Sequence, residues 1–95
     1  MTLCLVLHEL PEGGPEALEA AVWELSESHM MLGGGMLVET SVSARYLLTH
    51  LDGALLRAGL EGRLLVSEVV DGVHSTGLGP DAEAWVRGVL EGAAG

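Results

Sequence analysis

Apolar and polar positions follow each other in a pattern that predicts a succession of strands and helices. Residues 2–10, TLCLVLHEL, form a short and almost continuous apolar run that ends at PEGGP, as is typical of a central strand covered on both faces. Pro15 then stands where the first turn of a helix accepts proline. The apolar residues that follow have the i, i+3, i+4, i+7 spacing of a buried helix face: Leu18, Ala21, Val22 and Leu25.

Two further strands are predicted on either side of three glycines. SHMML at residues 28–32 and MLVETSV at residues 36–42 have the composition of strands, and Gly33 to Gly35 adopt positive φ at low cost. A hairpin is the natural interpretation, with the shorter strand at an edge of the sheet. The alternative is a phosphate-binding loop, but such a loop normally opens a helix, whereas a strand pattern follows here.

The clearest pattern in the chain is the helix that comes next. Ser43 is a good N-cap, and an apolar stripe follows it: Ala44, Leu47, Leu48, Leu51, Leu55 and Ala58. RLLVSEVV at residues 63–70 is predicted to be a strand, and residues 71–79 a loop. A last helix begins at Pro80, and its apolar face is Ala82, Trp85, Val86, Val89 and Leu90.

The order of these elements predicts an α/β fold of the α+β sandwich type, namely a ferredoxin-like β-α-β-β-α-β arrangement with an added C-terminal helix. The length fits a single domain, expected over residues 1–92, with residues 93–95 as a frayed tail. In this fold the first and third strands are adjacent and central. Two helices cover one face of the sheet, and the other face needs a different cover.

That second face is predicted to be too apolar to remain in contact with water. Alternation of side chains along the strands assigns Val6, Leu37, Leu65 and Val69 to it. The helix that carries Trp85 or a second subunit is expected to cover these residues, and a homodimer is the preferred answer. The expected interface residues are Val6, Leu37, Glu39, Leu65, Val69 and Trp85.

Charge narrows the set of partners. The formal net charge is −10, and the four basic residues are all arginine. Binding to nucleic acid through bare phosphate contacts needs many Lys and Arg side chains, so this composition argues against it. The charge favours solubility and leaves room for a basic protein partner. Lys, Asn, Gln, Ile and Phe are absent, which fits a GC-rich bacterial genome because most of these residues have codons rich in A or T.

The first residues and the cysteine content predict a cytoplasmic protein. Cys4 is the one cysteine, which excludes an intrachain disulfide and fits a reducing compartment. The N-terminal run MTLCLVLHEL has no basic leader and is too short for a signal peptide or a membrane span. No membrane association is expected.

The stretch MLVETSVSARYLLTHLDGALLRAGLEGRLLVSEVV, residues 36–70, resembles the second half of the CRISPR-associated endonuclease-like family of small ferredoxin-fold dimers. The likeness lies in a strand similar to LVETSVS, a Ser-capped helix and a strand similar to RLLVSEVV. It implies the fold and a dimer. Members of that family carry a tyrosine–aspartate pair at the end of the first strand, and the aspartate can hold a divalent metal for phosphodiester cleavage. His8 and Glu9 stand at the corresponding positions here, so the resemblance implies Mg²⁺ or Mn²⁺ at Glu9 if the activity persists.

His8 and Glu9 are therefore the candidate catalytic residues, and the alternative is that they are polar residues at the end of a strand. Neighbouring strand residues point to opposite faces, so the two form one site only if the strand ends there. His8 is also predicted to share the second face with Glu39 and Ser41, where a histidine–carboxylate pair would tune a proton or metal site.

Other reactive residues have simpler interpretations. Asp71, His74 and Ser75 are the residue types of a catalytic triad, but five consecutive positions of one loop cannot build its relay. The remaining histidines, His29 and His50, have no partner at ligand spacing, so there is no zinc signature. The acidic residues of the first helix are interpreted as a solvated face, and the cysteine as a small buried hydrophobe.

Several functions known for ferredoxin-like proteins are excluded because the residues they need are missing from the sequence. An acylphosphatase needs an asparagine, a copper carrier needs a Cys-x-x-Cys loop, and an RNA-recognition motif needs aromatic residues on its strands. Three hypotheses remain. The first is a non-enzymatic homodimeric interaction or assembly module without a cofactor. The second is a metal-dependent nuclease that uses Glu9, and the third is a small-ligand-binding regulatory domain.

Overall fold

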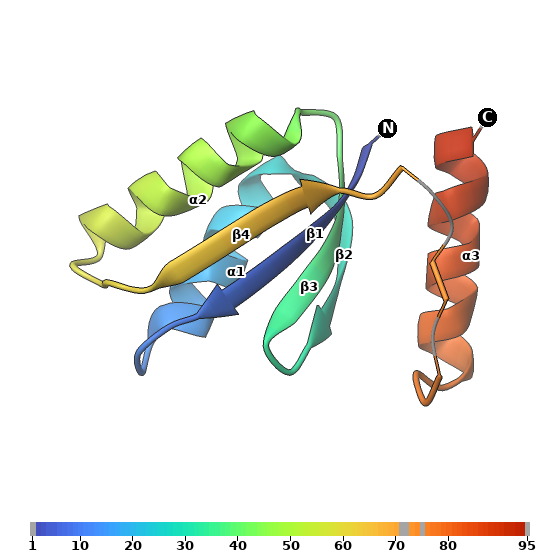
Figure 1. Ribbon diagram of the computed structural model, residues 1–95, viewed down its shortest axis with the longest axis horizontal. Helices are drawn as coiled ribbons and strands as arrows, with labels where there is room; N and C mark the ends of the chain where they lie inside the picture. Colours follow the sequence, from blue (N-terminus) through green and yellow to red (C-terminus); the bar gives the residue numbers. More distant parts are fainter. Residues whose placement is uncertain (1, 71–72, 75, 95) are drawn as a thin grey trace.

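The computed structural model describes residues 2–70, 73–74 and 76–94. Its element order is β-α-β-β-α-β-α (Figure 1), which confirms the predicted ferredoxin-like fold with a C-terminal helix. The elements are β1 (Thr2–Glu9), α1 (Gly14–Leu25), β2 (Ser26–Leu32), β3 (Gly35–Thr40), α2 (Ala44–Arg57), β4 (Arg63–Glu68) and α3 (Pro80–Ala94). The last helix thus extends two residues beyond the predicted domain end at residue 92. No helix among the described residues is long and apolar enough to cross a membrane.

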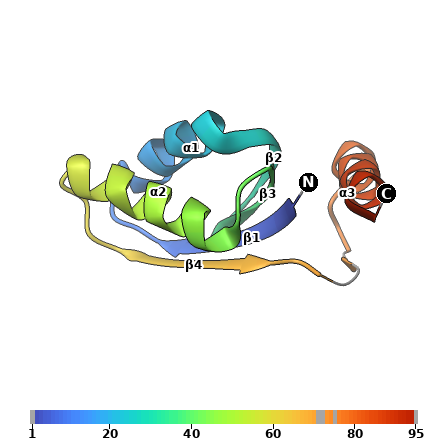
Figure 2. The ribbon, with the colours of Figure 1, turned by 90° about the horizontal axis from the view of Figure 1, so that it is seen from above.

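The four strands form one sheet in the order β2-β3-β1-β4, and every neighbouring pair is antiparallel. β1 and β3 are therefore central, and β2 is an edge strand, as predicted. Helices α1 and α2 lie side by side on one face of the sheet, whereas α3 stands at the end of the sheet near the N-terminus (Figure 2). We call the face under α1 and α2 the first face and the opposite one the second face.

Local sequence signals explain how the elements begin and connect. The Ser43 hydroxyl accepts a hydrogen bond from the Tyr46 backbone N–H at 3.1 Å, so it caps α2 as predicted. Gly33 and Gly34 form the predicted turn of the β2–β3 hairpin, but none of Gly33 to Gly35 has the positive φ expected of them. Gly35 is required there because a Cβ atom at this position would lie 2.7 Å from the Val6 carbonyl oxygen. The absence of a side chain at Gly35 thus allows β1 and β3 to approach each other closely at this point.

The main core lies between the first face and the two helices that cover it. Its buried residues are Cys4, Val6, Leu18, Ala21, Val22, Met36, Val38, Leu47, Leu51 and Leu55. The stripe predicted for α2 supplies three of them, and the stripe predicted for α1 supplies another three. Because the chain has few aromatic residues, burial of these aliphatic side chains supplies most of the hydrophobic stabilisation of the fold.

The predicted position of Val6 on the second face is wrong. Val6 lies opposite Met36 in β3 and Val66 in β4, and it is fully buried in the core under α1 and α2. Directly opposite residues of antiparallel strands share a face, so the three residues point toward the helices together. Both alternating sets in β1 are apolar, and for that reason the sequence did not reveal which set faces the helices.

A second, smaller core joins α3 to the second face. Its buried residues are Leu3, Leu37, Val86 and Val89, and the partly buried residues around it are Leu5, Met30, Val69, Val73, Leu78 and Trp85. The Val69 backbone N–H donates a hydrogen bond to the Leu3 carbonyl at 2.8 Å, which holds the chain leaving β4 against the start of β1. Helix α3 therefore covers the part of the second face near the N-terminus of β1.

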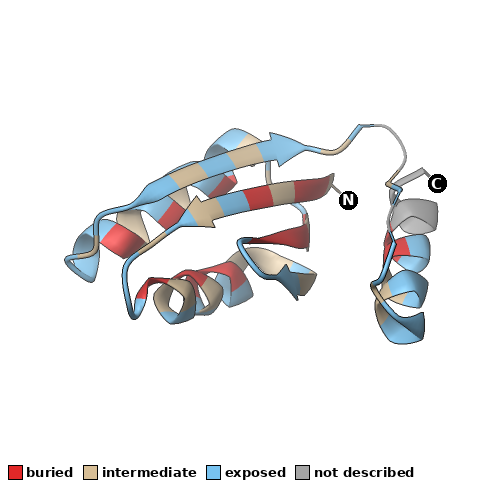
Figure 3. Ribbon diagram, turned by 60° about the horizontal axis from the view of Figure 1, so that its bottom comes forward, coloured by how far each residue is buried: buried red, intermediate tan, exposed pale blue. Residues whose placement is uncertain are grey.

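The other end of the second face is exposed. Leu32, Gly35, Leu7 and Leu65 lie in one row across the four strands because each is directly opposite the next. The three leucines are 40%, 45% and 54% exposed in that order. Exposed and half-buried colours run along β4 in Figure 3, in contrast to the buried start of β1. We call this row, together with Glu9 and Arg63 beside it, the open half of the second face.

Candidate functional site

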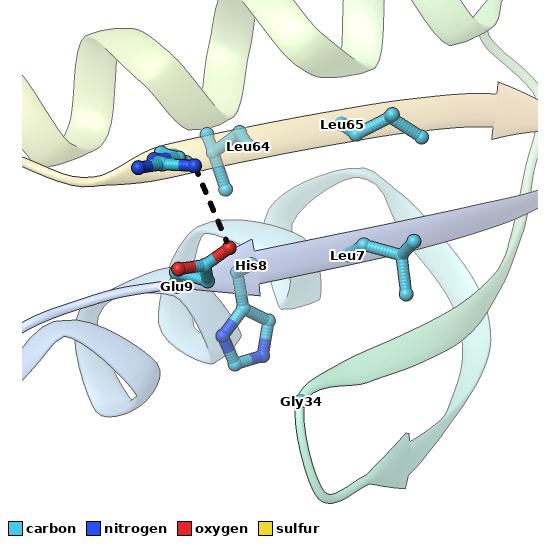
Figure 4. Close-up of a pocket in the computed structure, with 7 residues that line it drawn as sticks. Leu7, His8, Glu9, Gly34, Leu64 and Leu65 are labelled. Carbon is cyan, nitrogen blue, oxygen red and sulfur yellow. Dashed lines mark ion pairs between the residues drawn. The ribbon is translucent and has the colours of Figure 1, made fainter.

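A pocket of about 530 Å³ lies at the end of the sheet where β1 stops (Figure 4). Three strand ends or turns contribute to it: the last residues of β1, the turn of the β2–β3 hairpin, and the first residues of β4. The lining residues are Leu7, His8, Glu9, Gly34, Arg63, Leu64 and Leu65. The pocket therefore borders the open half of the second face and shares two leucines with it.

The antiparallel register explains why these residues meet. Glu9 is directly opposite Arg63, and His8 is directly opposite Leu64, so the end of β1 and the start of β4 present their side chains together. The His8 backbone N–H donates a hydrogen bond to the Gly34 carbonyl at 3.0 Å, which brings the hairpin turn against the same strand end. A side chain at Gly62 would lie 2.6 Å from the Glu9 carbonyl oxygen, so the approach of the two chains requires glycine there.

One acid and one base stand at the mouth of the pocket. The Glu9 carboxylate lies 4.0 Å from the Arg63 guanidinium, and both side chains are largely exposed; the dashed line in Figure 4 marks this ion pair. An exposed pair of this kind contributes at most about 1 kcal/mol to stability. Little free energy is lost when this ion pair separates, so each side chain is available to bind another charged group.

His8 supplies the buried polar group of the pocket. Its ring projects from β1 on the side of the β2–β3 turn (Figure 4). The Nε2 atom is buried and makes no hydrogen bond to any of the described residues. Leaving a buried polar atom without a partner costs about 1–3 kcal/mol, so such atoms are uncommon in folded proteins.

The structure brings His8 and Glu9 into one site but separates His8 from Glu39. β1 ends at Glu9, and this is why two consecutive residues with opposite directions both line the pocket. The predicted pairing of His8 with Glu39 is wrong. His8 has the direction of Cys4 and Val6 toward the first face, whereas Glu39 lies opposite Leu3 on the second face. The Glu39 carboxylate instead accepts a hydrogen bond from the Ser28 hydroxyl at 3.1 Å.

Four of the six residues predicted for an interface fall into two groups, apart from Val6 in the main core and Glu39 beside Ser28. Leu37 is buried in the core that joins α3 to the second face, and Val69 and Trp85, the latter on α3 itself, are partly buried around it. Leu65 lies in the open half, more than half exposed. The prediction that the last helix or a second subunit covers the second face therefore has a different outcome at each end of the sheet. Helix α3 covers one end, and the other end is exposed in a single chain.

Two histidine–glutamate pairs were missed by sequence reasoning. The buried His29 of β2 has its Nε2 atom 3.2 Å from a Glu19 carboxylate oxygen of α1, and its ring meets the Trp23 ring edge-on with centroids 4.8 Å apart. The His50 Nε2 atom of α2 lies 3.8 Å from the Glu24 carboxylate of α1. Both pairs are formed by tertiary packing, so no local spacing in the sequence indicates them. The contact of His29 with Glu19 links β2 to α1, whereas the His50 Nε2 atom makes no hydrogen bond to any described residue.

The remaining candidates offer no reactive centre within the part of the chain that the structure describes. Burial, followed by the negative charge of Glu68, raises the pKa of the Cys4 thiol above its ordinary value of 9.0, which disfavours the reactive thiolate. His74 is exposed, and its predicted neighbours Asp71 and Ser75 lie outside the described residues. Among residues 2–70, 73–74 and 76–94, no group of three or more His, Cys, Asp or Glu side chains is placed to hold a metal ion.

No family model, curated protein or solved structure matches this chain.

Proposed function

We propose that the protein is a non-enzymatic homodimeric interaction module, and that two copies pair through the open half of the second face. The observation that carries this proposal is the row of Leu32, Leu7 and Leu65, aligned across the sheet and 40–54% exposed. Large aliphatic side chains that are scattered singly need no explanation, but exposed leucines aligned on one face of a sheet are typical of an interaction surface.

The size of the exposed surface supports a partner. The accessible surface of the chain is 5774 Å², about a tenth more than the ~5,200 Å² expected for a folded monomer of 9.9 kDa. A stable interface removes roughly 800 Å² from each partner, so dimerisation would more than remove this excess.

Charge complementarity supports a second copy of this chain as the partner. A two-fold axis brings the same patch of both subunits together, so the patch must be self-complementary. The open half has an apolar centre and carries Glu9 and Arg63 side by side at its border. A two-fold axis parallel to the strands, between β1 and β4, places Glu9 of one copy opposite Arg63 of the other. The patch is thus locally neutral, although each chain carries a formal charge of −10.

The overall charge limits the strength of this dimer. Two copies repel each other through their excess of carboxylates, and this repulsion is screened by salt over about 10 Å at 0.1 M ionic strength. We therefore expect association in the micromolar range that becomes tighter as salt is added. The resemblance of residues 36–70 to a family of ferredoxin-fold dimers is consistent with such a partner. A basic protein would be a further partner of the acidic outer surface.

Light scattering after size-exclusion chromatography tests the proposal. The wild-type protein is expected to have twice the chain mass of 9.9 kDa at tens of micromolar, and Leu65→Glu the mass of one chain. The matched control is Leu56→Glu, because Leu56 is also an exposed leucine but lies on α2. A wild-type monomer, or dissociation by the control substitution to the same extent, would contradict the proposal.

A further inference from the structure

We infer that the pocket at the end of β1 binds a small zwitterion with an apolar side chain, of the α-amino acid class. The inference shares Leu7, Glu9, Arg63 and Leu65 with the proposed interface, so the ligand and a second copy compete for them, but it does not rest on the dimer because all seven lining residues belong to one chain. A monomer therefore has the complete site.

The two charges at the mouth of the pocket select the class of ligand. An α-carboxylate placed against Arg63 gains charge-assisted hydrogen bonds in the fork geometry of a guanidinium. An α-ammonium group placed against Glu9 gains the corresponding interaction with the carboxylate. The two ligand charges are attached to the same carbon, and the two protein charges are 4.0 Å apart, so both contacts form at once.

Ligands with a single charge fit this site less well. A simple carboxylate meets Arg63 but lies beside the Glu9 carboxylate, and a simple amine meets Glu9 but lies beside the guanidinium. The field of a chain with a net charge of −10 further disfavours anions. A zwitterion has no net charge. It replaces the exposed ion pair of Glu9 with Arg63 by two ion pairs, one between each of these residues and the ligand.

The rest of the pocket is matched to an apolar side chain. Leu7 and Leu65 form the apolar wall, and both are about half exposed without a ligand, whereas Leu64 packs against the core under α1 and α2. A volume of about 530 Å³ lies within the range of small-molecule sites and exceeds the need of the smallest amino acids. An aliphatic, thioether or aromatic side chain gains the free energy of removing these leucines from water.

His8 also lines the pocket, at the end of β1, with its ring on the side of the β2–β3 turn. Its neutral imidazole presents either an N–H group or a lone pair at Nε2, according to the tautomer. This atom is buried and has no hydrogen-bond partner among the described residues. The side chain is directed to the first face, whereas Glu9 and Arg63 lie on the second, so His8 does not take part in the two charged contacts with the ligand.

Isothermal titration calorimetry with L-leucine and two analogues is the test. The analogues are 4-methylpentanoate, which lacks the ammonium group, and 3-methylbutylamine, which lacks the carboxylate. We expect L-leucine to bind, and each analogue to bind at least about tenfold more weakly because it loses one charge-assisted contact. No heat of binding with millimolar L-leucine, or equal binding of either analogue, would overturn the inference.

Substitutions assign the contacts. Arg63→Gln is expected to weaken L-leucine about tenfold and to remove the preference over the amine, and Glu9→Gln to remove the preference over the carboxylate. The matched control is Arg57→Gln, because Arg57 is an exposed arginine in the last turn of α2 outside the pocket. Loss of affinity in the control equal to that of Arg63→Gln would contradict the assignment. Light scattering on the ligand-free protein separates the two proposals, since a protein that is monomeric without L-leucine and binds it contradicts only the dimer.

Discussion

Leu3 and Leu7 lie on the same strand and point to the same face of the sheet, but the former is 2% exposed and the latter 45%. The difference arises from α3, which packs against Leu3 through Val86 and Val89 and stands at that end of the sheet (Figure 1). Identical residues in one alternating pattern therefore have different roles. One end of the second face is part of a core, and the other is the surface that we propose for contact between copies.

The largest effect that separates the two ends is on stability. Leu3→Ala is expected to lower the free energy of unfolding by about 2–5 kcal/mol, because it leaves a cavity beneath α3. Leu7→Ala is the matched control and is expected to cost less than about 1 kcal/mol in a monomeric sample, because the side chain is half exposed already. Urea unfolding followed by circular dichroism measures both. Equal costs would mean that α3 does not cover the start of β1.

A smaller effect concerns Cys4, which lies next to Leu3 but points to the first face. Burial and the charge of Glu68 raise the pKa of its thiol, so the folded state holds this proton at pH values where the unfolded state has released it. Stability that is present below pH 9.0 is therefore expected to decline as the pH rises above that value. Urea unfolding at pH 8, 9 and 10 measures the decline, and Cys4→Ala is expected to lack it. The same decline in both proteins would assign it to other groups.

The smallest effect is expected at Glu9, at the border of the open half. Glu9→Ala should change the free energy of unfolding by less than about 1 kcal/mol, since the pair with Arg63 is exposed. The same variant tests the nuclease hypothesis. We expect no cleavage of DNA or RNA by the wild-type protein with Mg²⁺ or Mn²⁺, measured on gels. Cleavage by the wild type that disappears in the variant would overturn the non-enzymatic proposal and make Glu9 a catalytic residue.

Local signals were sufficient to predict most of the fold. The cap at Ser43, the glycines before β3 and the apolar stripes of α1 and α2 each depend on a few neighbouring residues, and each element is present. The orientation of β1 was not predictable, because Leu3 and Leu5 on one face are as apolar as Cys4 and Val6 on the other. Burial in a strand with two apolar faces is decided by which elements cover it.

The candidate site was predicted in part. Strand-end position and resemblance indicated His8 and Glu9, and both line the pocket. Arg63 and Gly34 were missed because they come from other elements, and the register of β1 with β4 and the hydrogen bond of the hairpin turn bring them there. The pair of His29 with Glu19 was missed for the same reason, since it depends on how β2 packs against α1. Sequence patterns describe elements, whereas sites between elements depend on their packing.

The most direct test of the central claim is a dilution series followed by amide chemical shifts in two-dimensional NMR. If copies pair through the open half, dilution from millimolar to micromolar concentration shifts the amide signals of Leu7, Leu32 and Leu65, and those of Leu47, Leu51 and Leu56 in α2 stay in place. Shifts confined to α1 and α2, or no shift at any residue over that range, would contradict the account.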